Sequence, residues 1–497
     1  MRRGIAPALI VGAGSEWLDF GRCFPKNHHT RRRWKMGKDA VNKPLNIAEE
    51  DLTEPLTYPV EAFLSRDYAQ AEKDRLWPKV WQLVERVEDF KEVGDFVTYN
   101  IADDSIIVIK TGEASFNAFH NVCPHRGRQL IDTPDDVHSV RGNRRNFVCG
   151  FHGWTFDTDG NNIYVLDPQD WKGALTPERT CLSRVKVDTW GGWVWINMDP
   201  GCEPLVDFLG RAGELLSHFE MDKMRYKWRK WVVYPSNWKT ALEAFMEPYH
   251  VAGTHTQLLA HAEYYAYSAA YGLHGVSGFD QKGLEAKMSE GSTVTRAGKG
   301  DDPRVSTYEL IHENYETLNY AASTQTLVEA ASRLKDELPE GATAPEVIAH
   351  WLKSAKADDA ARGVAWPEIP PAVVAEAGLA WHVFPNMSVL QGITFALCYR
   401  ARPFGDDPNM CIFESYAIER YPEGAEPATE WERAEPTAEN WGAILAQDFS
   451  NMRWVQKGMK SRGFRGPLPN PHQERKITNF HRNLAKFMGT GEPRLLK

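Results

Sequence analysis

The hydrophobic and polar positions along the chain change their pattern from one stretch to the next. Residues 1–50 have no periodicity, so we expect a tail there. From Glu61 to Trp77 apolar residues recur at helical spacing, which predicts a surface helix that Pro78 ends. Between about 93 and 200, short apolar and β-branched runs are separated by Gly, Asp, Asn and Pro. That arrangement predicts a compact antiparallel β domain with frequent turns.

Beyond Pro204 helical and strand-like stretches are mixed. Helical periodicity is found at 205–223, 239–251, 325–336, 344–357, 438–461 and 473–488. Strand-like runs are found at 225–234, 380–401 and 410–420. The segment 260–378 has little strand character, and we expect helices and loops there that cover one side of the core. The whole pattern predicts an α+β fold, in which an antiparallel β domain precedes a larger antiparallel sheet surrounded by helices.

The composition narrows the class of protein. Of the 497 residues, 42% are hydrophobic and 25% are charged, which is typical of a soluble globular chain. Basic residues number 58 and acidic residues 67, so the net charge of −9 argues against a nucleic-acid partner. The sequence has no apolar run of about eighteen residues, so we expect no membrane span.

Cysteine usage and the first residues bear on location. The seven cysteines are odd in number and widely spaced, which is unlike a disulfide framework and suits a reducing cytoplasm. Arg2 and Arg3 precede a short apolar stretch, Ile5–Val11, which weakly imitates a secretory signal. No small-x-small cleavage site follows, and the next stretch is polar and basic. We therefore expect an N-terminal extension on a cytoplasmic protein rather than an export signal.

Two short motifs carry the clearest chemistry in the sequence. They are Cys123-Pro-His125-Arg-Gly and Cys149-Gly-Phe-His152-Gly-Trp, each on a predicted loop between strands. Two thiolates and two imidazoles suit a [2Fe–2S] cluster in which the cysteines hold one iron and the histidines the other. Neutral histidine ligands reduce the negative charge on such a cluster and raise its reduction potential.

Zinc binding and plain core packing are the competing interpretations of these motifs. Zinc fingers usually pair Cys with Cys and His with His along the chain, whereas each loop here carries one of each. Core packing is disfavoured because four such residues, each near a turn-forming Gly or Pro, fall within about thirty positions. The iron–sulfur cluster is therefore the preferred interpretation.

A second candidate site lies in the segment Asn237–His255. His250 and His255 are five residues apart, which would turn them about 140° from each other on an unbroken helix. Gly253 lies between them, and we expect a break there that lets both imidazoles converge. Two His and one carboxylate with open positions form the facial triad that binds Fe(II) and activates O2. Spacing alone leaves two unrelated histidines as the alternative.

Asp448 is the candidate carboxylate. An ionised Asp on a buried helix face is costly unless it is paired or bound to metal. A salt bridge to a core arginine and a metal site would both satisfy that condition. Asp448 shares the apolar stripe of the predicted helix 441–459 with Trp441, Leu445, Met452, Val455 and Met459.

Together these motifs resemble the Rieske non-haem iron aromatic-ring-hydroxylating oxygenases, in particular their alpha (large, catalytic) subunit. The two loops are similar to the family's Rieske domain, and the segment around His250 resembles its pattern N-W-K … E … (D/E)-x-x-H-x4-H. The resemblance implies a [2Fe–2S] cluster held by Cys123, His125, Cys149 and His152. It implies a mononuclear Fe(II) held by His250, His255 and Asp448.

The resemblance also implies a bridging role for Glu247. This residue precedes His250 by three positions, so on a helix the two side chains share a face. In the family, a carboxylate here is thought to connect a ligand His to a cluster His of the neighbouring subunit. Such a contact would orient the ligand imidazole and complete a short path for the electron. A solvent-exposed glutamate is the alternative.

An activity and partners follow from the same resemblance. A reductase, directly or through a ferredoxin, would pass electrons from NADH or NADPH to the cluster, and O2 would be activated at the iron to hydroxylate an aromatic or other hydrophobic substrate. The assembly would be a head-to-tail homotrimer, with or without β subunits. Because Glu247 also occurs in relatives that oxidise quaternary amines, monooxygenation or demethylation of a non-aromatic substrate stays open. A pure electron-transfer Rieske protein and a zinc-stabilised binding protein are the remote alternatives.

Three positions depart from the family pattern or need their own prediction. The linker 126–148 is longer than is usual, and its polar, turn-rich residues predict a bulge into solvent. Ala244 stands where many relatives have Asn, and His382 is expected to be a packed or pocket-lining residue. The predicted domains are an N-terminal extension at 1–50, a helical part of the catalytic domain at 51–92, the Rieske domain at 93–203 and the catalytic iron domain at 204–497.

Overall fold

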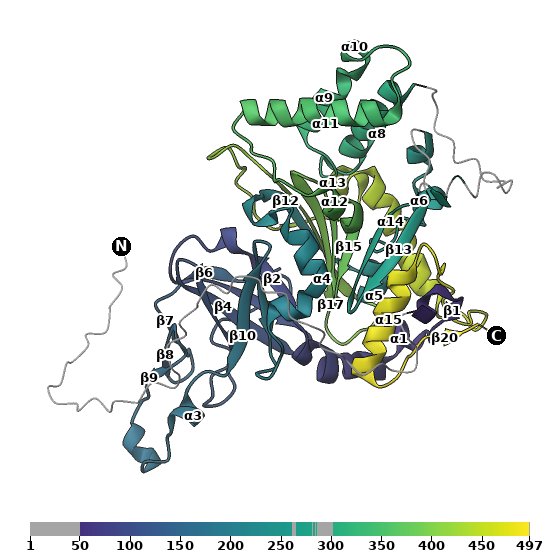
Figure 1. Ribbon diagram of the computed structural model, residues 1–497. Helices are drawn as coiled ribbons and strands as arrows, with labels where there is room; N and C mark the ends of the chain where they lie inside the picture. Colours follow the sequence, from purple (N-terminus) through teal and green to yellow (C-terminus); the bar gives the residue numbers. More distant parts are fainter. Residues whose placement is uncertain (1–49, 261–264, 281, 284, 286–301, 497) are drawn as a thin grey trace, which may run out of the picture.

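The computed structural model of this protein describes residues 50–260, 265–280, 282–283, 285 and 302–496. The predicted extension 1–50 lies almost wholly outside the described residues. Two main antiparallel sheets lie next to each other, and helices surround the larger one (Figure 1). One hydrophobic core joins them, since Trp195 of the smaller sheet and Phe413 of the larger belong to the same cluster of buried side chains. The expected α+β fold is confirmed.

The smaller main sheet carries the cluster motifs at one end. Within the described residues its strands follow the order β2-β11-β10-β5-β4-β3-β6. Their bounds are β2 Gln82–Arg86, β3 Asp95–Ile101, β4 Asp104–Gly112, β5 Ser115–His120, β6 Arg141–Asn143, β10 Arg184–Trp190 and β11 Trp193–Asn197. A small sheet beside it consists of β7 Asn146–Val148, β8 Thr155–Asp157 and β9 Asn162–Tyr164. Strand β2 belongs to this sheet although it lies in the segment 51–92, before the predicted start of the Rieske domain at residue 93. That domain boundary stays a prediction.

The larger sheet has the order β13-β14-β15-β16-β17-β18-β12-β19 in the described part of the chain, and β19 alone pairs in parallel. Its strands are β12 Arg225–Tyr234, β13 Ala266–Tyr271, β14 His274–Phe279, β15 Ala380–Val383, β16 Met387–Gln391, β17 Phe395–Pro403, β18 Cys411–Glu419 and β19 Glu432–Arg433. The predicted strand-like run 380–401 is thus three strands joined by tight turns.

The helices pack on the larger sheet or extend beyond it. They are α4 Leu205–Ser217, α5 Trp238–Glu243, α6 Val251–Thr254, α8 Pro303–Thr317, α9 Gln325–Ser332, α10 Leu334–Glu337, α11 Ala344–Ala361, α12 Pro371–Ala377, α13 Ala438–Trp441, α14 Ala443–Gly458 and α15 Arg475–Met488. Nearer the N-terminus lie β1 Leu56–Thr57, which pairs with β20 Arg494–Leu495, and the short helices α1 Glu61–Leu64, α2 Arg66–Ala71 and α3 Pro177–Thr180. The predicted helix over 61–77 is therefore interrupted at Ser65.

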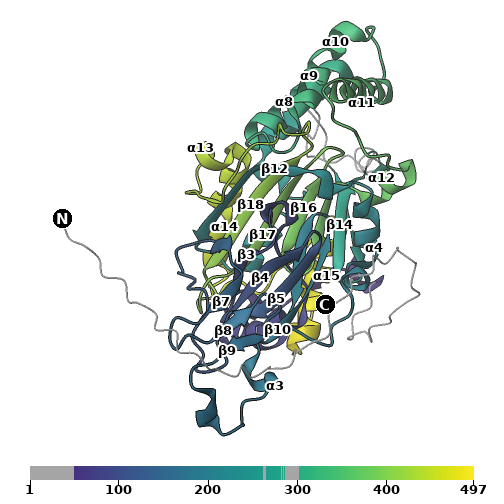
Figure 2. The ribbon, with the colours of Figure 1, turned by 90° about the vertical axis from the view of Figure 1, so that its left-hand side faces the viewer.

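Helices α8 to α11 form a lobe beyond one end of the larger sheet (Figures 1 and 2). The lobe is held together by small apolar clusters of its own, which include Leu327 with Ala355 and Leu334 with Val347. None of the described helices is long and apolar enough to cross a membrane.

Alternation along the strands gives the larger sheet two different faces. In β17, Tyr399 stacks on Phe245, just after α5, with ring centroids 4.1 Å apart. Its neighbour Arg400 points the other way, toward the smaller sheet, and donates to the carbonyl oxygens of Leu83 and Val84 at 2.6 and 2.9 Å. One face therefore supports the helices around the candidate iron site, and the other face packs against the cluster-bearing sheet.

A buried polar cluster joins the two sheets at this second face. Glu414 of β18 accepts hydrogen bonds from Arg400 and Arg402 of β17. It also lies 2.6 Å from Nε2 of His138, whose ring stacks on Trp431 at 4.0 Å. Burial lowers the pKa of His138 to about 4, so the neutral imidazole donates its Nε2–H to Glu414. Two arginines and one imidazole thus satisfy a fully buried carboxylate.

This cluster adds one exception to the prediction that the polar residues of the linker 126–148 bulge into solvent. Residues 134–136 are exposed, as the bulge prediction requires. His138 is buried instead, and the residues after it form the edge strand β6. Arg141 in that strand pairs with Asp89 at 3.2 Å. The linker is therefore exposed at 134–136 and 142–146, as predicted, and is anchored at His138 and Arg141, whose partners lie far away in the sequence.

The segment 260–378 contains a hairpin that the sequence did not predict. Strands β13 and β14 extend the larger sheet at its edge, where small residues (Ala, Ser and Gly) are frequent. Small residues have low strand propensity, so the sequence of β13 and β14 does not look like a strand. Helix α15 packs so closely on this hairpin that larger side chains would clash. A Cβ placed on Gly275, for example, would lie 2.4 Å from the Cβ of Lys476. The other described elements of this segment are helices and loops, as expected.

Candidate metal centres

The two cluster motifs form matching turns. In both loops the N–H of the Cys donates to the carbonyl oxygen five residues later at 2.8 Å. A glycine four positions after each Cys donates back to that Cys, and its φ is positive, +76° at Gly127 and +70° at Gly153. Side chains other than Gly are strained at such φ values. The glycines therefore close two similar loops that present Cys123 and Cys149 toward the same place.

The four candidate cluster ligands meet between these loops. Cys123 and Cys149 are buried, and their thiols lie within hydrogen-bonding reach of each other. Burial raises the pKa of the Cys123 thiol to about 11. The rings of His125 and His152 lie 4.6 Å apart, edge to face. Nδ1 of His152 is buried and has no hydrogen-bond partner among the described residues.

An unpartnered buried imidazole nitrogen is costly unless a ligand satisfies it. Here it stands beside a second imidazole and two thiols, which is the donor set of a cluster held by two Cys and two His. The residues present therefore fit a Rieske [2Fe–2S] cluster. The four ligands predicted from the sequence lie close together in the structure.

Cys149→Ser is expected to bleach the protein. A serine hydroxyl replaces thiolate poorly as a ligand of an iron–sulfur cluster, so visible absorption and acid-labile sulfide per chain should fall together. Cys202→Ser is the matched control, because Cys202 is a free, partly exposed thiol outside the motifs, and that variant should keep its colour. Unchanged colour in Cys149→Ser would remove Cys149 from the ligand set.

The second candidate site is built on α5, α6 and α14. Asn237 caps α5 by accepting a hydrogen bond from the N–H of Lys239 at 3.0 Å. The N–H of Asn237 and the hydroxyl of Thr240 both donate to Oε1 of Gln456 in α14, at 3.1 and 3.0 Å. These contacts fasten the helix before the two histidines to the helix that carries Asp448.

The turn between the two histidines differs from the prediction. Helix α6 is a single turn that begins after His250 and contains Gly253. Gly253 is therefore helical, and the expected break at this residue is wrong. The chain leaves the helix at His255, where φ is −109° and ψ is 52°. Because the helix ends there, His255 is free of the helical spacing that would have turned it away from His250.

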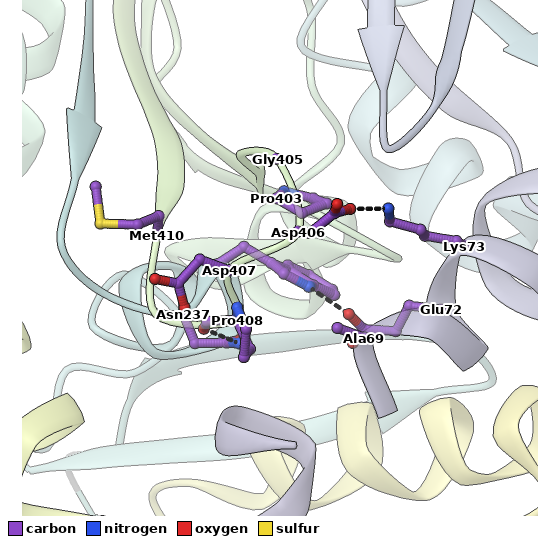
Figure 3. Close-up of a pocket in the computed structure, with 11 residues that line it drawn as sticks. Ala69, Glu72, Lys73, Asn237, Pro403, Gly405, Asp406, Asp407, Pro408 and Met410 are labelled. Atoms are coloured by element: carbon purple, nitrogen blue, oxygen red, sulfur yellow. Dashed lines mark hydrogen bonds and ion pairs between the residues drawn. The ribbon is translucent and has the colours of Figure 1, made fainter. Parts of the chain in front are cut away.

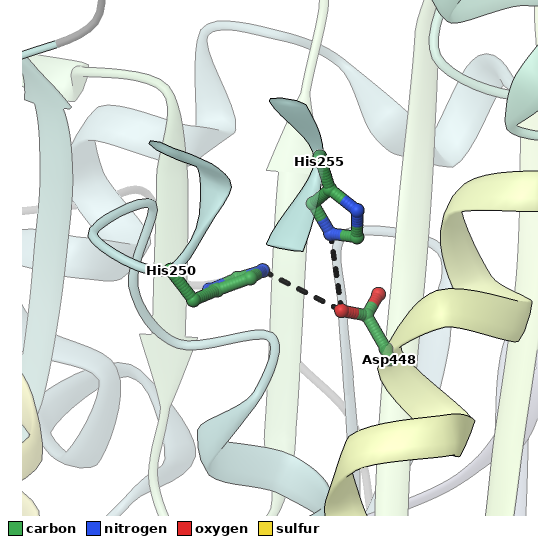
Figure 4. Close-up of side chains that lie close together, drawn as sticks. All are labelled: His250, His255 and Asp448. Carbon is green, nitrogen blue, oxygen red and sulfur yellow. Dashed lines mark ion pairs between the residues drawn. The ribbon is translucent and has the colours of Figure 1, made fainter. Parts of the chain in front are cut away.

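His250, His255 and Asp448 converge (Figure 4). Nε2 of His255 lies 3.0 Å and Nε2 of His250 lies 3.5 Å from the same oxygen, Oδ1 of Asp448. One potential ligand atom from each residue lies within 4.8 Å of the others. Asp448 is buried on α14, as its apolar stripe predicted, and no arginine pairs with it among the described residues. The set fits one divalent ion with positions left open for other ligands.

Glu247 and Gln447 form hydrogen bonds with the Nδ1 atoms of the two imidazoles, on the side away from Asp448. Nδ1 of His250 lies 2.8 Å from Oε1 of Glu247, and the N–H of His250 donates to the other carboxylate oxygen at 2.9 Å. Burial lowers the pKa of His250, but the hydrogen bond and charge of Glu247 outweigh it and raise the pKa to about 9. Glu247 is thus no solvent-exposed glutamate, since its side chain is only 8% exposed.

The hydrogen-bond partner of His255 was not predicted from the sequence. Nδ1 of His255 lies 2.7 Å from Oε1 of Gln447, and Gln257 donates to the same oxygen at 3.0 Å. Gln447 precedes Asp448 by one position, which is about 100° around the helix and off the apolar stripe. The position of Gln447 next to the proposed ligand Asp448 is the signal that the sequence offers. The structure then shows that its side chain reaches His255.

Two other features are structural. His382 is fully buried in β15 with Nε2 3.2 Å from the carbonyl oxygen of Pro385, so it is a packed residue, as expected. Figure 3 shows a cavity between α5 and the N-terminal helices, where Nε1–H of Trp238 donates to Glu72 at 3.1 Å. Glu72 also pairs with the buried Lys239. Because these groups satisfy one another, their contacts anchor α5 to the N-terminal helices.

Comparison with known proteins bears on both centres. The family model "Ring hydroxylating alpha subunit (catalytic domain)" matches residues 219–490, and the model "Rieske [2Fe-2S] domain" matches residues 80–171. The benzene 1,2-dioxygenase subunit alpha of Pseudomonas putida is 28% identical over 202 residues, 39% of this chain and 43% of that protein. The carnitine monooxygenase oxygenase subunit of Escherichia coli is 28% identical over 205 residues, 41% of this chain and 53% of that protein. The matched part thus spans about half the length of these curated relatives.

Solved structures share the fold over most of the chain. The quaternary ammonium Rieske monooxygenase CntA in complex with L-carnitine has a TM-score of 0.58 at 17% identity, covering 90% of this chain and 100% of that chain. Naphthalene 1,2-dioxygenase from Rhodococcus sp. bound to indole has a TM-score of 0.54 at 18% identity, covering 87% of this chain and 94% of that chain. At such identities the likeness extends to the fold alone.

Proposed function

We infer the function from one premise, that this chain belongs to the ring-hydroxylating alpha-subunit family and carries a Rieske [2Fe–2S] domain. It is then the terminal oxygenase component of a multicomponent Rieske oxygenase. It uses O2, and electrons from NADH or NADPH delivered by a reductase or ferredoxin, to hydroxylate an aromatic or other hydrophobic substrate. The convergence of His250, His255 and Asp448 is the observation that supports this proposal most strongly.

The proposed ligands divide into two sets. Cys123, Cys149, His125 and His152 would hold the [2Fe–2S] cluster, and His250, His255 and Asp448 would hold the mononuclear iron. When bound, the cluster supplies electrons one at a time and the iron supplies the site for O2 chemistry.

The protein's own side chains fix the geometry around these sites. Glu247 accepts a hydrogen bond from Nδ1–H of His250, so the proton stays on Nδ1 and Nε2 of this imidazole is left for the metal. Asp448 brings one negative charge into a buried place, where it lowers the free energy of binding a cation. Phe245, just after α5, packs on Phe413 of β18 with ring centroids 5.1 Å apart, which gives the sheet side an apolar surface.

The assembly we propose is a head-to-tail homotrimer, with or without β subunits, in which Glu247 connects His250 to a cluster His of the neighbouring subunit. The arrangement of the single chain supports it. In Figure 1 the small sheet β7–β9, which lies beside the cluster loops, is at the opposite end of the molecule from α6. Transfer between neighbouring chains would avoid that separation.

A second substrate class is supported by a specific observation. The carnitine monooxygenase oxygenase subunit matches this chain as well as the benzene dioxygenase subunit does, at 28% identity. Monooxygenation of a quaternary amine, or demethylation, is therefore the alternative to ring hydroxylation.

The deciding experiment is a turnover assay with a surrogate reductase, scored by product formation under 18O2. Benzene, naphthalene and indole represent the first class, and L-carnitine and γ-butyrobetaine the second. Labelled diol or phenol supports ring hydroxylation, and labelled product from the amines supports the alternative. A colourless protein that contains stoichiometric zinc would contradict the oxygenase function altogether.

A further inference from the structure

The two candidate imidazole ligands have different outer partners. Nδ1 of His250 meets the carboxylate of Glu247 at 2.8 Å, whereas Nδ1 of His255 meets the amide oxygen of Gln447 at 2.7 Å. The first partner is an anion and the second is neutral. Both arrangements leave Nε2 directed at Oδ1 of Asp448.

The amide of Gln447 is itself held in one orientation. Gln257 donates from Nε2 to Oε1 of Gln447 at 3.0 Å, and Nε2 of Gln447 approaches Oε1 of Gln257 at 3.5 Å. Because Oε1 already accepts from Gln257, it is the oxygen of Gln447, and not its NH2 group, that faces His255. An oxygen can only accept, so Nδ1 of His255 carries the proton and its Nε2 keeps a free lone pair.

We propose that Gln447, oriented by Gln257, is the positioning residue that fixes His255 as a metal ligand through a neutral acceptor. This inference rests on the proposed function, since it takes His255, His250 and Asp448 as the ligand set. It assigns a role to a side chain that touches neither metal nor substrate. Outer partners of this kind fix the tautomer and orientation of a ligand imidazole, and they raise its basicity less when they carry no charge.

The neutrality of Gln447 has a consequence for charge at the site. Asp448 and Glu247 together carry two negative charges, which balance one divalent ion. A glutamate at 447 would add a third charge beside the same ion. Gln447 therefore orients His255 without changing the charge balance that Asp448 and Glu247 set.

The test uses the full-length protein with its cluster intact, from which the mononuclear metal has been removed by a chelator. Co(II) is titrated back, and both its dissociation constant and its visible ligand-field spectrum are recorded. Gln447→Met keeps the length of the side chain but removes the acceptor, and it should weaken Co(II) binding by about 10- to 100-fold and alter the spectrum. Gln447→Glu keeps an acceptor and should bind Co(II) at least as tightly as the wild type.

Two further variants complete the experiment. Gln257→Met should weaken binding by a smaller factor than Gln447→Met, because it frees the amide but leaves it in place. Gln325→Met, at an exposed glutamine of α9 whose side chain pairs with Glu329, is the matched control and should behave as the wild type. Wild-type affinity and spectrum in Gln447→Met would overturn the proposal, as would equal loss in Gln447→Glu, which would mean that the amide donates. If the wild type binds Co(II) no better than His255→Ala, the ligand set itself fails and the proposed function falls with it.

Discussion

His250→Ala is expected to lose the mononuclear iron and to lower product formation on the order of a thousandfold or more, while the cluster remains. His250 supplies one of the three ligand atoms that converge within 4.8 Å in the described part of the chain, and two remaining ligands cannot form a facial triad. The cluster loops belong to the other sheet, so their absorption should not change. Iron and acid-labile sulfide per chain, together with the visible spectrum, measure the two centres separately.

His312→Ala is the control for this experiment. His312 is an exposed histidine on α8 that contacts neither centre, so its loss should leave both metals and turnover as they are. Joint loss of iron and cluster in His250→Ala would argue against two separate sites. Retention of the iron would remove His250 from the ligand set.

The parts of these centres that the sequence reveals are local. Cys123 and Cys149 each stand four positions before a glycine, and that glycine is required for the positive φ that closes the loop. The motif therefore carries both the ligands and the reason for their turn. Asp448 is similar, because its place on an apolar stripe already predicts burial, and burial of a carboxylate demands a partner.

The parts that the sequence hides depend on contacts between distant segments. His138 lies in a polar linker, and the residues around it do not indicate that it will be buried in a hydrogen bond with Glu414, far along the chain. Gln447 meets His255 across the fold, where the contact between Gln456 and Asn237 holds α14 against α5. The expected break at Gly253 was wrong for the same reason. A glycine favours a turn locally, whereas the position where α6 ends is decided by the packing around it.

Glu247→Gln is expected to keep both metals and to slow electron transfer between the two centres by about 100-fold. The substitution preserves shape and still offers Nδ1 of His250 an acceptor, but it removes the negative charge that makes the imidazole more basic. The pKa of His250, which Glu247 raises to about 9, should fall as a result. Reoxidation of the reduced cluster, followed by stopped-flow absorption in the presence of O2 and substrate, measures the transfer directly.

Glu243→Gln is the comparison that isolates the bridging role of Glu247. Glu243 lies four positions earlier and pairs with His481 at 2.6 Å instead of with a candidate ligand. Both variants remove one largely buried carboxylate from the same region, so a general electrostatic effect would slow both alike. Slow reoxidation in Glu247→Gln alone would mean that the carboxylate on His250 lies in the electron path. Wild-type reoxidation in Glu247→Gln would refute that role and leave Glu247 only the task of orienting the imidazole.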